Sequence, residues 1–192
     1  MKNITYQLFQ IAVNFAFVVA VIFSFGFFLL IIWLLIRLTS QGPGLLKQDR
    51  IGKNGKVFKC IKFRTMNNNT RQAASHEISQ SAITPIGAFL RKYKIDEFPQ
   101  IINIIAGEMI LIGPRPCLPV QEELIEERNK RGVNDVLPGI TGWSQANGVD
   151  MSNPTKLAIM DADYIANRSV RLDIKILAMT FLGKGNGDRT AK

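Results

Sequence analysis

Two adjacent carboxylates, Asp96 and Glu97, are the residues best placed to do chemistry in this chain of 192 residues. Three basic residues precede them: Arg91, Lys92 and Lys94. Taken alone, the pair followed by Pro99 is an ordinary helix start, because acidic side chains favour the first turn and proline favours helix entry. A Gly-Pro-Arg-Pro turn at residues 113–116 follows within one helix. Carboxylates and phosphate-binding cations can therefore converge on one site.

The net charge of +9 belongs to the part of the chain that follows an apolar N-terminal segment. The first 48 residues contain no Asp or Glu, and Lys2 is the only basic residue before Arg37. A strongly basic surface predicts phosphate-bearing partners, which include nucleic acid, anionic lipid headgroups and nucleotide sugars. Charge alone does not choose among them.

The cysteines and the histidine argue against a zinc site, a disulfide framework and histidine-based catalysis. Cys60 and Cys117 lie far apart without metal-ligand spacing, so we expect both to be reduced, cytosolic thiols. His76 is the only histidine and sits in a polar stretch that is typical of a solvated loop. We therefore assign no chemistry to these three residues.

The segment from Leu8 to Ile36 is almost wholly apolar and uncharged, as in a helix embedded in a bilayer. A straight helix of about 30 residues measures roughly 45 Å, longer than the roughly 30 Å hydrocarbon core, so it must tilt, kink or turn back. No small-residue cleavage pattern follows, and we expect the segment to stay attached. The excess of Lys and Arg after it places the soluble part in the cytoplasm. Without further motifs, the simplest interpretation is a single-pass anchor with an unrelated basic domain.

The turn at Gly42-Pro43-Gly44 separates two predicted domains. Residues 1–40 form a membrane-anchoring helical segment, and residues 41–192 form a cytosolic catalytic domain. Asn54-Gly55 lies between two partly alternating stretches, which is typical of a short β-hairpin. Residues 66–84 are polar and poor in aliphatic side chains, which predicts a loop or a mobile lid.

Helices are predicted for most of the remaining chain, so the fold class is α+β and mainly helical. Thr84-Pro85 begins one helix, and a second runs from Asp96 to Met109 with apolar side chains at helical spacing. Further helices are expected near residues 122–130, 154–167 and 172–182. The first of these is rich in Glu and looks like a solvated, salt-bridged face, to which we assign no chemistry. The last either lies on a membrane or closes the core.

Several motifs in a fixed order give the chain a family resemblance. They are Gln48-Asp49-Arg50-Ile51-Gly52, Lys62-Phe63-Arg64-Thr65-Met66, Asp96 to Asn103, Gly107-Glu108-Met109, Gly113-Pro114-Arg115-Pro116, Pro138 to Gln145, and Asp161 through Tyr164 to Asp173. A lone Gly-Pro-Arg-Pro or Asp-Glu would be weak support, whereas the ordered set is hard to meet by chance. Over nearly its whole length the chain resembles the monotopic phosphoglycosyl transferases, also called bacterial sugar transferases.

The resemblance implies a two-step transfer. Asp96 would be the nucleophile that attacks the sugar-bearing phosphate of a UDP-sugar, expelling UMP and leaving an aspartyl phosphosugar. Polyprenyl phosphate, such as undecaprenyl phosphate, would then attack that intermediate. A carboxylate that attacks an anionic diphosphate meets charge repulsion, which a divalent cation and basic side chains must offset. By the same resemblance, Glu97 looks like the ligand of a Mg²⁺ ion.

Four basic residues are counted as phosphate-binding: Lys62, Arg64, Arg91 and Arg115. Without the resemblance, a solvated basic face is the simpler interpretation of any one of them. Gln145 is counted as substrate-binding, because it and Trp143 can face the nucleotide base or ribose. A turn that packs Trp143 into the core would have the same residues in its sequence, so this assignment stays open.

The expected location is the cytoplasmic face of the bacterial inner membrane, with a re-entrant helix hairpin as the anchor. The family commonly breaks this helix with a Ser-Pro pair, where this chain reads Ser24-Phe25-Gly26-Phe27, so a tilted full span competes with the hairpin. Asn14 stands where the family has an Asp, and Leu137 stands where a basic residue is usual. The expected partners are a UDP-sugar, polyprenyl phosphate and membrane lipid, with a second copy or other glycan-pathway enzymes as further candidates, and no nucleic acid.

Two alternatives belong to other functional classes. A membrane-tethered nucleic-acid-binding protein would use the +9 charge and Trp143, although no recognisable binding motif supports it. Steeply salt-dependent binding of DNA or RNA, without UMP release from any UDP-sugar, would favour it. A catalytically silent scaffold for glycan assembly would show no activity when purified.

Overall fold

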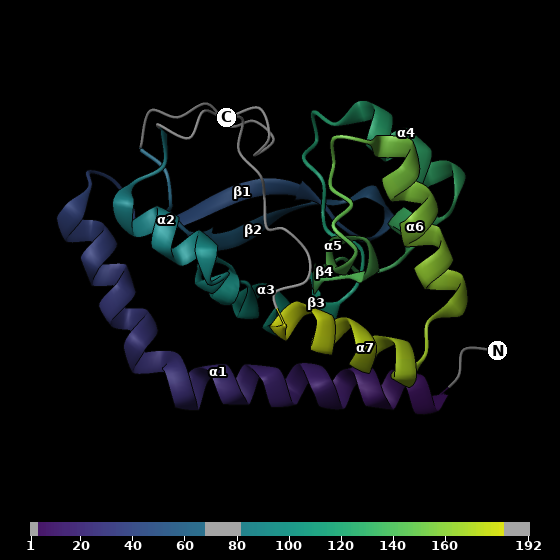
Figure 1. Ribbon diagram of the computed structural model, residues 1–192, viewed down its shortest axis with the longest axis horizontal. Coiled ribbons are helices and arrows are strands. Elements are labelled where there is room, and N and C mark those ends of the chain that lie inside the picture. Colours follow the sequence, from purple (N-terminus) through teal and green to yellow (C-terminus); the bar gives the residue numbers. More distant parts are fainter. Residues whose placement is uncertain (1–3, 68–81, 183–192) are drawn as a thin grey trace.

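The computed structural model describes residues 4–67 and 82–182, which form a small domain lying along one side of a long N-terminal helix (Figure 1). Most of the predicted loop at residues 66–84, including His76, lies outside the described residues. The described part is mainly helical, with two small two-stranded sheets. The predicted α+β class is confirmed.

Helix α1 (Ile4–Thr39) contains the predicted anchor and bends in its middle, so that it has two arms (Figure 1). Phe17 of the first arm and Ile36 of the second both pack on the domain that follows. Ser24 and Gly26 lie between these contacts, and Gly and Ser are common sites of helix kinks. The anchor is thus one bent helix, the kinked form among the three geometries that length allows, and its re-entrant course in the membrane stays a prediction.

The surface of α1 is strongly apolar. Among the described residues, α1 is the one helix that is long and apolar enough to cross a membrane. Large side chains project outward from it, including Phe15, Phe23 and Phe27, which are 70%, 85% and 79% exposed. An apolar surface of this extent is rare on a soluble monomer and indicates contact with lipid or a partner. Membrane association is therefore supported by α1.

Strands β1 (Leu45–Ile51) and β2 (Val57–Phe63) form the predicted hairpin and pair antiparallel along their whole length. The connecting turn, η1 (Lys53–Gly55), has φ angles of 57° at Asn54 and 71° at Gly55. Asn and Gly tolerate this left-handed region, which explains the Asn-Gly pair at the turn.

Helix α2 (Pro85–Lys92) begins as predicted, because Thr84 Oγ1 accepts a hydrogen bond from Gly87 N at 3.0 Å. This N-terminal cap satisfies a backbone donor that has no partner within the helix.

The single helix predicted from Asp96 to Met109 is wrong. The chain instead forms a 3₁₀ turn, η4 (Ile95–Gln100), and a short helix, α3 (Ile101–Ile105). Gly107, with a φ of 71°, then turns the chain out of the helix. The helical spacing of the apolar residues was misleading, because Ile105 is 65% exposed whereas Met109 is buried in another cluster.

The second sheet was not predicted. Strand β3 (Ile110–Ile112) pairs parallel with β4 (Gly139–Thr141), a segment that the sequence indicates only as turn-rich. The two backbones approach so closely that a Cβ atom on Gly139 would lie 2.1 Å from Gly113 N. Glycine is therefore required at residue 139, and the sheet joins the 113–116 turn to the 138–145 motif.

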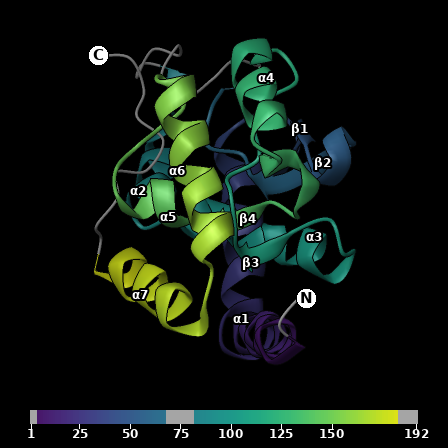
Figure 2. The ribbon, with the colours of Figure 1, turned by 90° about the vertical axis from the view of Figure 1, so that its right-hand side faces the viewer.

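The remaining elements pack on one another. They are α4 (Glu122–Lys130), η5 (Val133–Asp135), α5 (Trp143–Ala146), α6 (Pro154–Asn167) and α7 (Val170–Phe181). Helix α7 contacts both strands of the second sheet. Figure 2 shows α4 at the end of the domain that is remote from α7 and the first arm of α1, and α6 running from that end toward α7. The interpretation that the last helix closes the core is supported, because Ile176 is fully buried, and the membrane interpretation of its exposed end at Phe181 stays a prediction.

Buried polar contacts fasten the first arm of α1 to the domain. Tyr6 and Tyr164 each donate a hydrogen bond of 2.9 Å to the buried carboxylate of Asp173. Further along the same arm, Asn14 Oδ1 accepts a hydrogen bond of 2.8 Å from Leu111 N. The start of α1 is thus attached to the same domain as its end.

Candidate active site

A cavity of about 630 Å³ lies between α1, η4, α5 and α7. Its polar wall contains three guanidinium groups and four carboxylates: Arg50, Arg91, Arg115, Asp96, Glu97, Asp150 and Asp161. Its apolar wall comes largely from α1 and α7: Val13, Ala16, Phe17, Leu177 and Phe181. A charged reactant and an apolar chain can therefore meet in one cavity.

The turn η4 presents both carboxylates to the cavity, and its neighbours fix its place. Lys94 has a φ of 56° just before the turn, which redirects the chain out of α2. After the turn, the buried Asn103 fastens α3 to β2: its Nδ2 donates to Lys59 O at 2.8 Å and its Oδ1 accepts from Ile61 N at 3.0 Å. Asp96 is itself only 9% exposed. Backbone contacts on both sides therefore hold the expected nucleophile.

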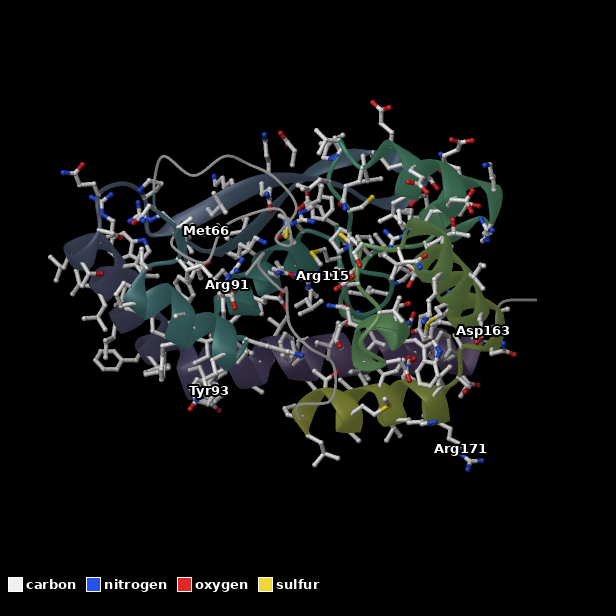
Figure 3. All side chains as sticks on the ribbon, turned by 45° about the horizontal axis from the view of Figure 1, so that its top comes forward. Met66, Arg91, Tyr93, Arg115, Asp163 and Arg171 are labelled. Carbon is white, nitrogen blue, oxygen red and sulfur yellow. The ribbon has the colours of Figure 1, made fainter. Side chains whose placement is uncertain are left out.

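Glu97 and Arg115 form an ion pair across the polar wall. Arg115 Nη2 lies 2.7 Å from Glu97 Oε1, and both side chains are mostly buried. Figure 3 shows Arg91 and Arg115, from α2 and from the 113–116 turn, in the central part of the molecule. The structure thus brings these two predicted phosphate-binding residues to the same cavity as Asp96 and Glu97.

Arg91 is equipped to bind an anion. Its Nε donates to Thr65 Oγ1 at 3.2 Å, which fixes the side chain. Its Nη1 is buried and has no hydrogen-bond partner among the described residues. A buried donor without a partner is costly, and a phosphate oxygen in the cavity would satisfy it.

Gln145 also has a buried side-chain atom without a hydrogen-bond partner among the described residues, but in this case the atom is an acceptor. Its Nε2 donates to Ile140 O at 3.3 Å, which orients the amide. Its Oε1 is buried without a hydrogen-bond partner in the part of the chain that the structure describes, although the residue lines the cavity. The site therefore offers an acceptor that suits an N–H or hydroxyl donor of a substrate.

Arg64 does not fit its predicted phosphate role. Its guanidinium donates to the backbone oxygens of Ser40 at 3.0 Å, of Ile36 at 3.4 Å and of Gln41, and to Ser40 Oγ at 2.8 Å. These acceptors lie at the end of α1, where helix carbonyls lack partners within the helix. Arg64 is not among the described residues that line the cavity. In this structure Arg64 caps α1 and joins it to the domain, and its phosphate role stays a prediction that these contacts do not support.

Lys62 is placed near the site but not on its wall. It is 9% exposed on β2, a strand that runs beside η4, and it is absent from the described residues that line the cavity. Its phosphate role stays a prediction.

Some residues of the cavity were missed in the sequence. Arg50, Lys94 and Asp150 line it, and Arg50 is held by hydrogen bonds to Pro116 O at 3.0 Å and to Gln48 Oε1 at 2.8 Å. The signal for Arg50 was its place in the Gln48 to Gly52 motif. For Lys94 it was the neighbourhood of Asp96.

The two cysteines are free and buried. Burial raises the pKa of both the Cys60 and the Cys117 thiol above its ordinary value. A raised pKa keeps a thiol protonated and weakens it as a nucleophile. The absence of an assigned role for them agrees with this environment.

The polar wall fits a Mg²⁺ ion whose coordination shell is completed by substrate oxygens. It does not fit a Mg²⁺ ion that is coordinated by protein side chains alone. Among the described residues no group of three or more His, Cys, Asp or Glu side chains is placed to hold a metal ion. Mg²⁺ is commonly bound through one or two carboxylates, with phosphate oxygens and waters in the other positions. Glu97, a hard oxygen donor on the cavity wall, matches that arrangement.

The chain is similar to several known proteins. The family model of the bacterial sugar transferases matches residues 5–184. The uncharacterized sugar transferase EpsL of Bacillus subtilis (strain 168) is 39% identical over 145 residues, which cover 76% of this chain and 71% of that protein. The UDP-glucose:undecaprenyl-phosphate glucose-1-phosphate transferase of Escherichia coli (strain K12) is 38% identical over 158 residues, which cover 77% of this chain and 34% of that protein. The exopolysaccharide production protein PSS of Rhizobium leguminosarum bv. phaseoli is 36% identical, with 82% and 85% covered.

A small α+β domain with a long apolar helix and a cavity that combines carboxylates, cations and apolar side chains fits an enzyme that works beside lipid. The chain belongs to the bacterial sugar transferase family. The predicted family and the transferase class are thereby confirmed, and the nucleic-acid-binding interpretation loses its support. The matched part spans about a third of several relatives, such as the Escherichia coli enzyme at 34%.

Proposed function

We propose that this chain transfers a phosphosugar from a UDP-sugar to polyprenyl phosphate and releases UMP, through an aspartyl phosphosugar on Asp96. The observation that carries the proposal is the single cavity that joins Asp96 to cations on one wall and to α1 and α7 on the other. Relatives from Escherichia coli and Komagataeibacter xylinus are named for glucose-phosphate transfer to undecaprenyl phosphate. The reaction would be the first membrane step of bacterial glycan assembly.

In the first step an Asp96 carboxylate oxygen attacks the sugar-bearing phosphorus of the UDP-sugar. A new P–O bond forms to Asp96 while the bond to the UMP oxygen breaks, and UMP leaves with the electron pair. Arg91 and Arg115 stabilise the negative charge on the phosphoryl oxygens, Arg91 through its buried and unpartnered Nη1. The Glu97 ion pair keeps Arg115 in place.

In the second step an oxygen of polyprenyl phosphate attacks the same phosphorus. The bond to Asp96 breaks, the free carboxylate is restored, and the sugar leaves on a polyprenyl diphosphate. The apolar wall formed by Phe17 of α1 and Leu177 of α7 gives the first isoprene units a dry surface beside the nucleophile. A soluble donor and a lipid acceptor can then use the site in turn.

Mg²⁺ is part of the proposal, with Glu97 as its protein ligand. When bound, the ion would supply charge neutralisation at the diphosphate, which favours attack by an anionic carboxylate. Chelation is expected to abolish UMP release, and added Mg²⁺ is expected to restore it.

The arrangement of α1 supports a re-entrant anchor, in which both ends of the helix reach the cytoplasmic face of the inner membrane. Asn14 near one end and Ile36 near the other both contact the same domain. A straight span would place these contacts on opposite sides of the bilayer. A cysteine introduced as Asn3→Cys should react with an impermeant thiol reagent from the cytoplasmic side, and reaction from the periplasmic side alone would refute the arrangement.

The decisive experiment measures UMP release from a panel of UDP-sugars by the purified protein in lipid nanodiscs with Mg²⁺. Without polyprenyl phosphate we expect a burst of about one UMP per active site, and turnover only when the lipid is added. Asp96→Asn should lower turnover by at least about 10³-fold, because it removes the nucleophile. Asp163→Asn, an exposed carboxylate on α6, is the matched control and should be as active as the natural chain. Full activity of Asp96→Asn would eliminate the nucleophile assignment.

A further inference from the structure

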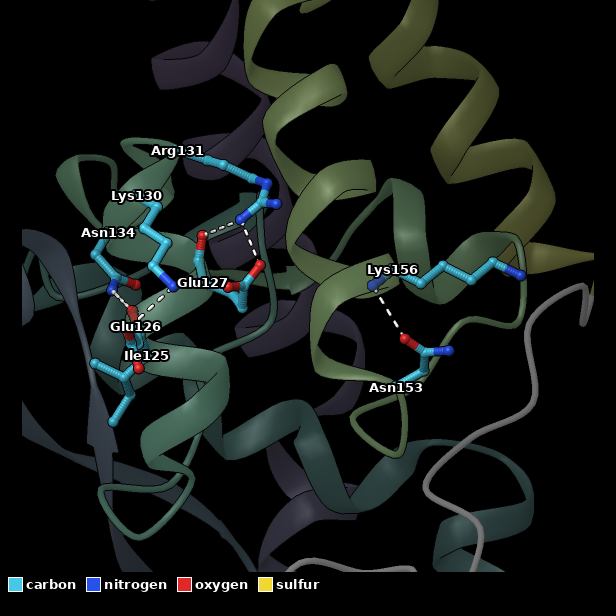
Figure 4. A network of polar contacts seen from close by, with 8 residues as sticks. All are labelled: Ile125, Glu126, Glu127, Lys130, Arg131, Asn134, Asn153 and Lys156. Carbon is cyan, nitrogen blue, oxygen red and sulfur yellow. Dashed lines mark hydrogen bonds and ion pairs between the residues drawn. The ribbon is translucent and has the colours of Figure 1, made fainter.

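Helix α4 carries two kinds of charged side chain. Its outer face is the salt-bridged surface that the sequence predicts: Lys130 Nζ lies 2.9 Å from a Glu126 carboxylate oxygen and 3.0 Å from one of Glu127 (Figure 4). Arg128 differs, because its side chain is only 3% exposed and is directed into the domain. Taking a guanidinium out of water is costly, so its partners indicate what it does.

Arg128 connects two segments that are remote in sequence. Its Nε and Nη2 donate to Asp161 Oδ2 at 3.1 and 2.6 Å, and its Nη1 donates to Arg115 O at 2.8 Å. The other oxygen of this carboxylate, Asp161 Oδ1, accepts from Ser144 Oγ at 2.6 Å. One buried network thus runs from the 113–116 turn through α4 and α6 to α5.

The two ends of this network lie on the cavity. Arg115 and Ser144 both line it, as does Asp161 between them, whereas Arg128 is not among the described residues that do. We propose that Arg128 is a positioning residue of the active site, which holds Arg115 and α5 at a fixed separation through Arg115 O and Asp161.

The chemistry of the guanidinium explains why an arginine occupies this position. Its planar fork offers donors in fixed directions, so it can bind a carboxylate and a carbonyl at once, which a lysine ammonium does not do with the same geometry. A buried ion pair adds little net stability compared with apolar residues of similar volume. The network is therefore better explained by the geometry that it imposes on the cavity than by the stability that it provides.

The test compares variants that separate geometry from stability. Arg128→Lys keeps a cation next to Asp161 but loses the fork, and Arg128→Met with Asp161→Leu replaces the buried pair by apolar side chains. We expect both to unfold within a few degrees of the natural chain and to show UMP turnover lowered by about 10-fold to 10²-fold, because misplacement of about 1 Å is enough for such a loss. Glu126→Gln with Lys130→Gln removes an exposed pair from the same helix and should leave turnover unchanged.

A second measurement does not need activity. The chain has two tryptophans, so Trp33→Phe leaves Trp143, the neighbour of Ser144, as the only reporter of α5. In that background, Arg128→Lys and the double apolar replacement should each increase acrylamide quenching of Trp143. Ser144→Ala leaves the ion pair of Arg128 with Asp161 intact and should also increase the quenching of Trp143. This variant keeps the test valid if the double replacement does not fold.

The outcomes separate this inference from the proposed function, on which only its turnover test rests. If the natural chain releases no UMP, the proposed function fails, and the quenching of Trp143 still decides the role of Arg128. If Arg128→Lys keeps natural turnover and natural quenching, Arg128 has no positioning role. A fall in turnover that only follows the folded fraction would likewise assign the network to stability alone.

Discussion

Two arginines of this protein have opposite surroundings. Arg64 lies at the junction of α1 with β1, and Arg91 lies on the cavity wall at α2. At the junction, both terminal nitrogens of Arg64 donate to oxygens at the end of α1, so only its buried Nε lacks a partner among the described residues. At the wall, the terminal Nη1 of Arg91 lacks one. Protein oxygens that pair with both terminal nitrogens of an arginine favour a structural role, whereas an unsatisfied terminal donor beside a cavity favours a role in binding a ligand. Substitution should therefore affect stability at one place and catalysis at the other.

After loss of the nucleophile itself, the largest effect on activity is expected from Arg91→Gln, which removes the charge from the cavity wall. UMP turnover should fall by about 10² to 10³-fold, the usual cost of losing one preorganised donor to a developing negative charge. The free energy of unfolding should fall by only about 1 kcal/mol, because Nη1 has no protein partner among the described residues and only the bond from Nε to Thr65 Oγ1 is lost. Lys92→Gln, on the exposed side of the same helix, is the control for charge and should retain activity. Equal losses of turnover in Arg91→Gln and Lys92→Gln would mean that general electrostatic attraction of the substrate, and not one positioned donor, explains the effect of Arg91.

Arg64→Ala should show the reverse pattern. It leaves carbonyl oxygens at the end of α1 without donors, and we expect the free energy of unfolding to fall by about 3 kcal/mol. Turnover per folded molecule should stay within about threefold, since Arg64 does not line the cavity among the described residues. Chemical denaturation in detergent, combined with the UMP assay at several folded fractions, measures both quantities. Lys47→Ala on the exposed face of β1 serves as the control. A catalytic loss with unchanged stability would restore the phosphate role that the sequence suggested.

Local chemistry explains which parts of this comparison the sequence could predict. The Asn-Gly turn and the Thr84 cap depend on a few neighbouring residues, and both were predicted correctly. Asp96, Glu97 and Arg115 were expected to converge because ordered motifs flank a short stretch of chain. The cavity does bring them together, although their roles stay predictions.

Tertiary contacts explain the rest. After the 3₁₀ turn at η4, Asn103 is held against β2 by hydrogen bonds to its backbone, a contact that no periodicity displays. The pairing of β3 with β4 joins segments separated by α4, and strands of three residues leave almost no pattern. Arg64 and Arg128 look like other surface cations in the sequence, and only their buried partners distinguish them.

Gln145→Leu tests the polar contact on the far side of the cavity and should have a smaller effect than loss of a cation. The change keeps the volume but removes the buried Oε1 acceptor, so a neutral hydrogen bond to the substrate is lost. We expect KM for the UDP-sugar to rise by about 10-fold with kcat nearly constant, the pattern of a contact made equally in the ground and transition states. Asn147→Ala, exposed at the end of α5, should leave KM unchanged. A fall in kcat alone would place Gln145 with the reacting phosphate instead of the base or ribose.

The smallest effect on stability and turnover is expected for an ion pair that is exposed and does not line the cavity. Lys59 Nζ lies 2.7 Å from Asp49 Oδ1 on the hairpin, and the two side chains are 63% and 46% exposed. Water screens such a pair, so Asp49→Asn with Lys59→Gln should change the free energy of unfolding by less than about 1 kcal/mol. Turnover should be unaffected, although the distance is as short as that between Glu97 and Arg115. Because the two pairs share a length of 2.7 Å and differ in burial and place, a large effect at Lys59 would show that short contacts alone predict importance in this protein.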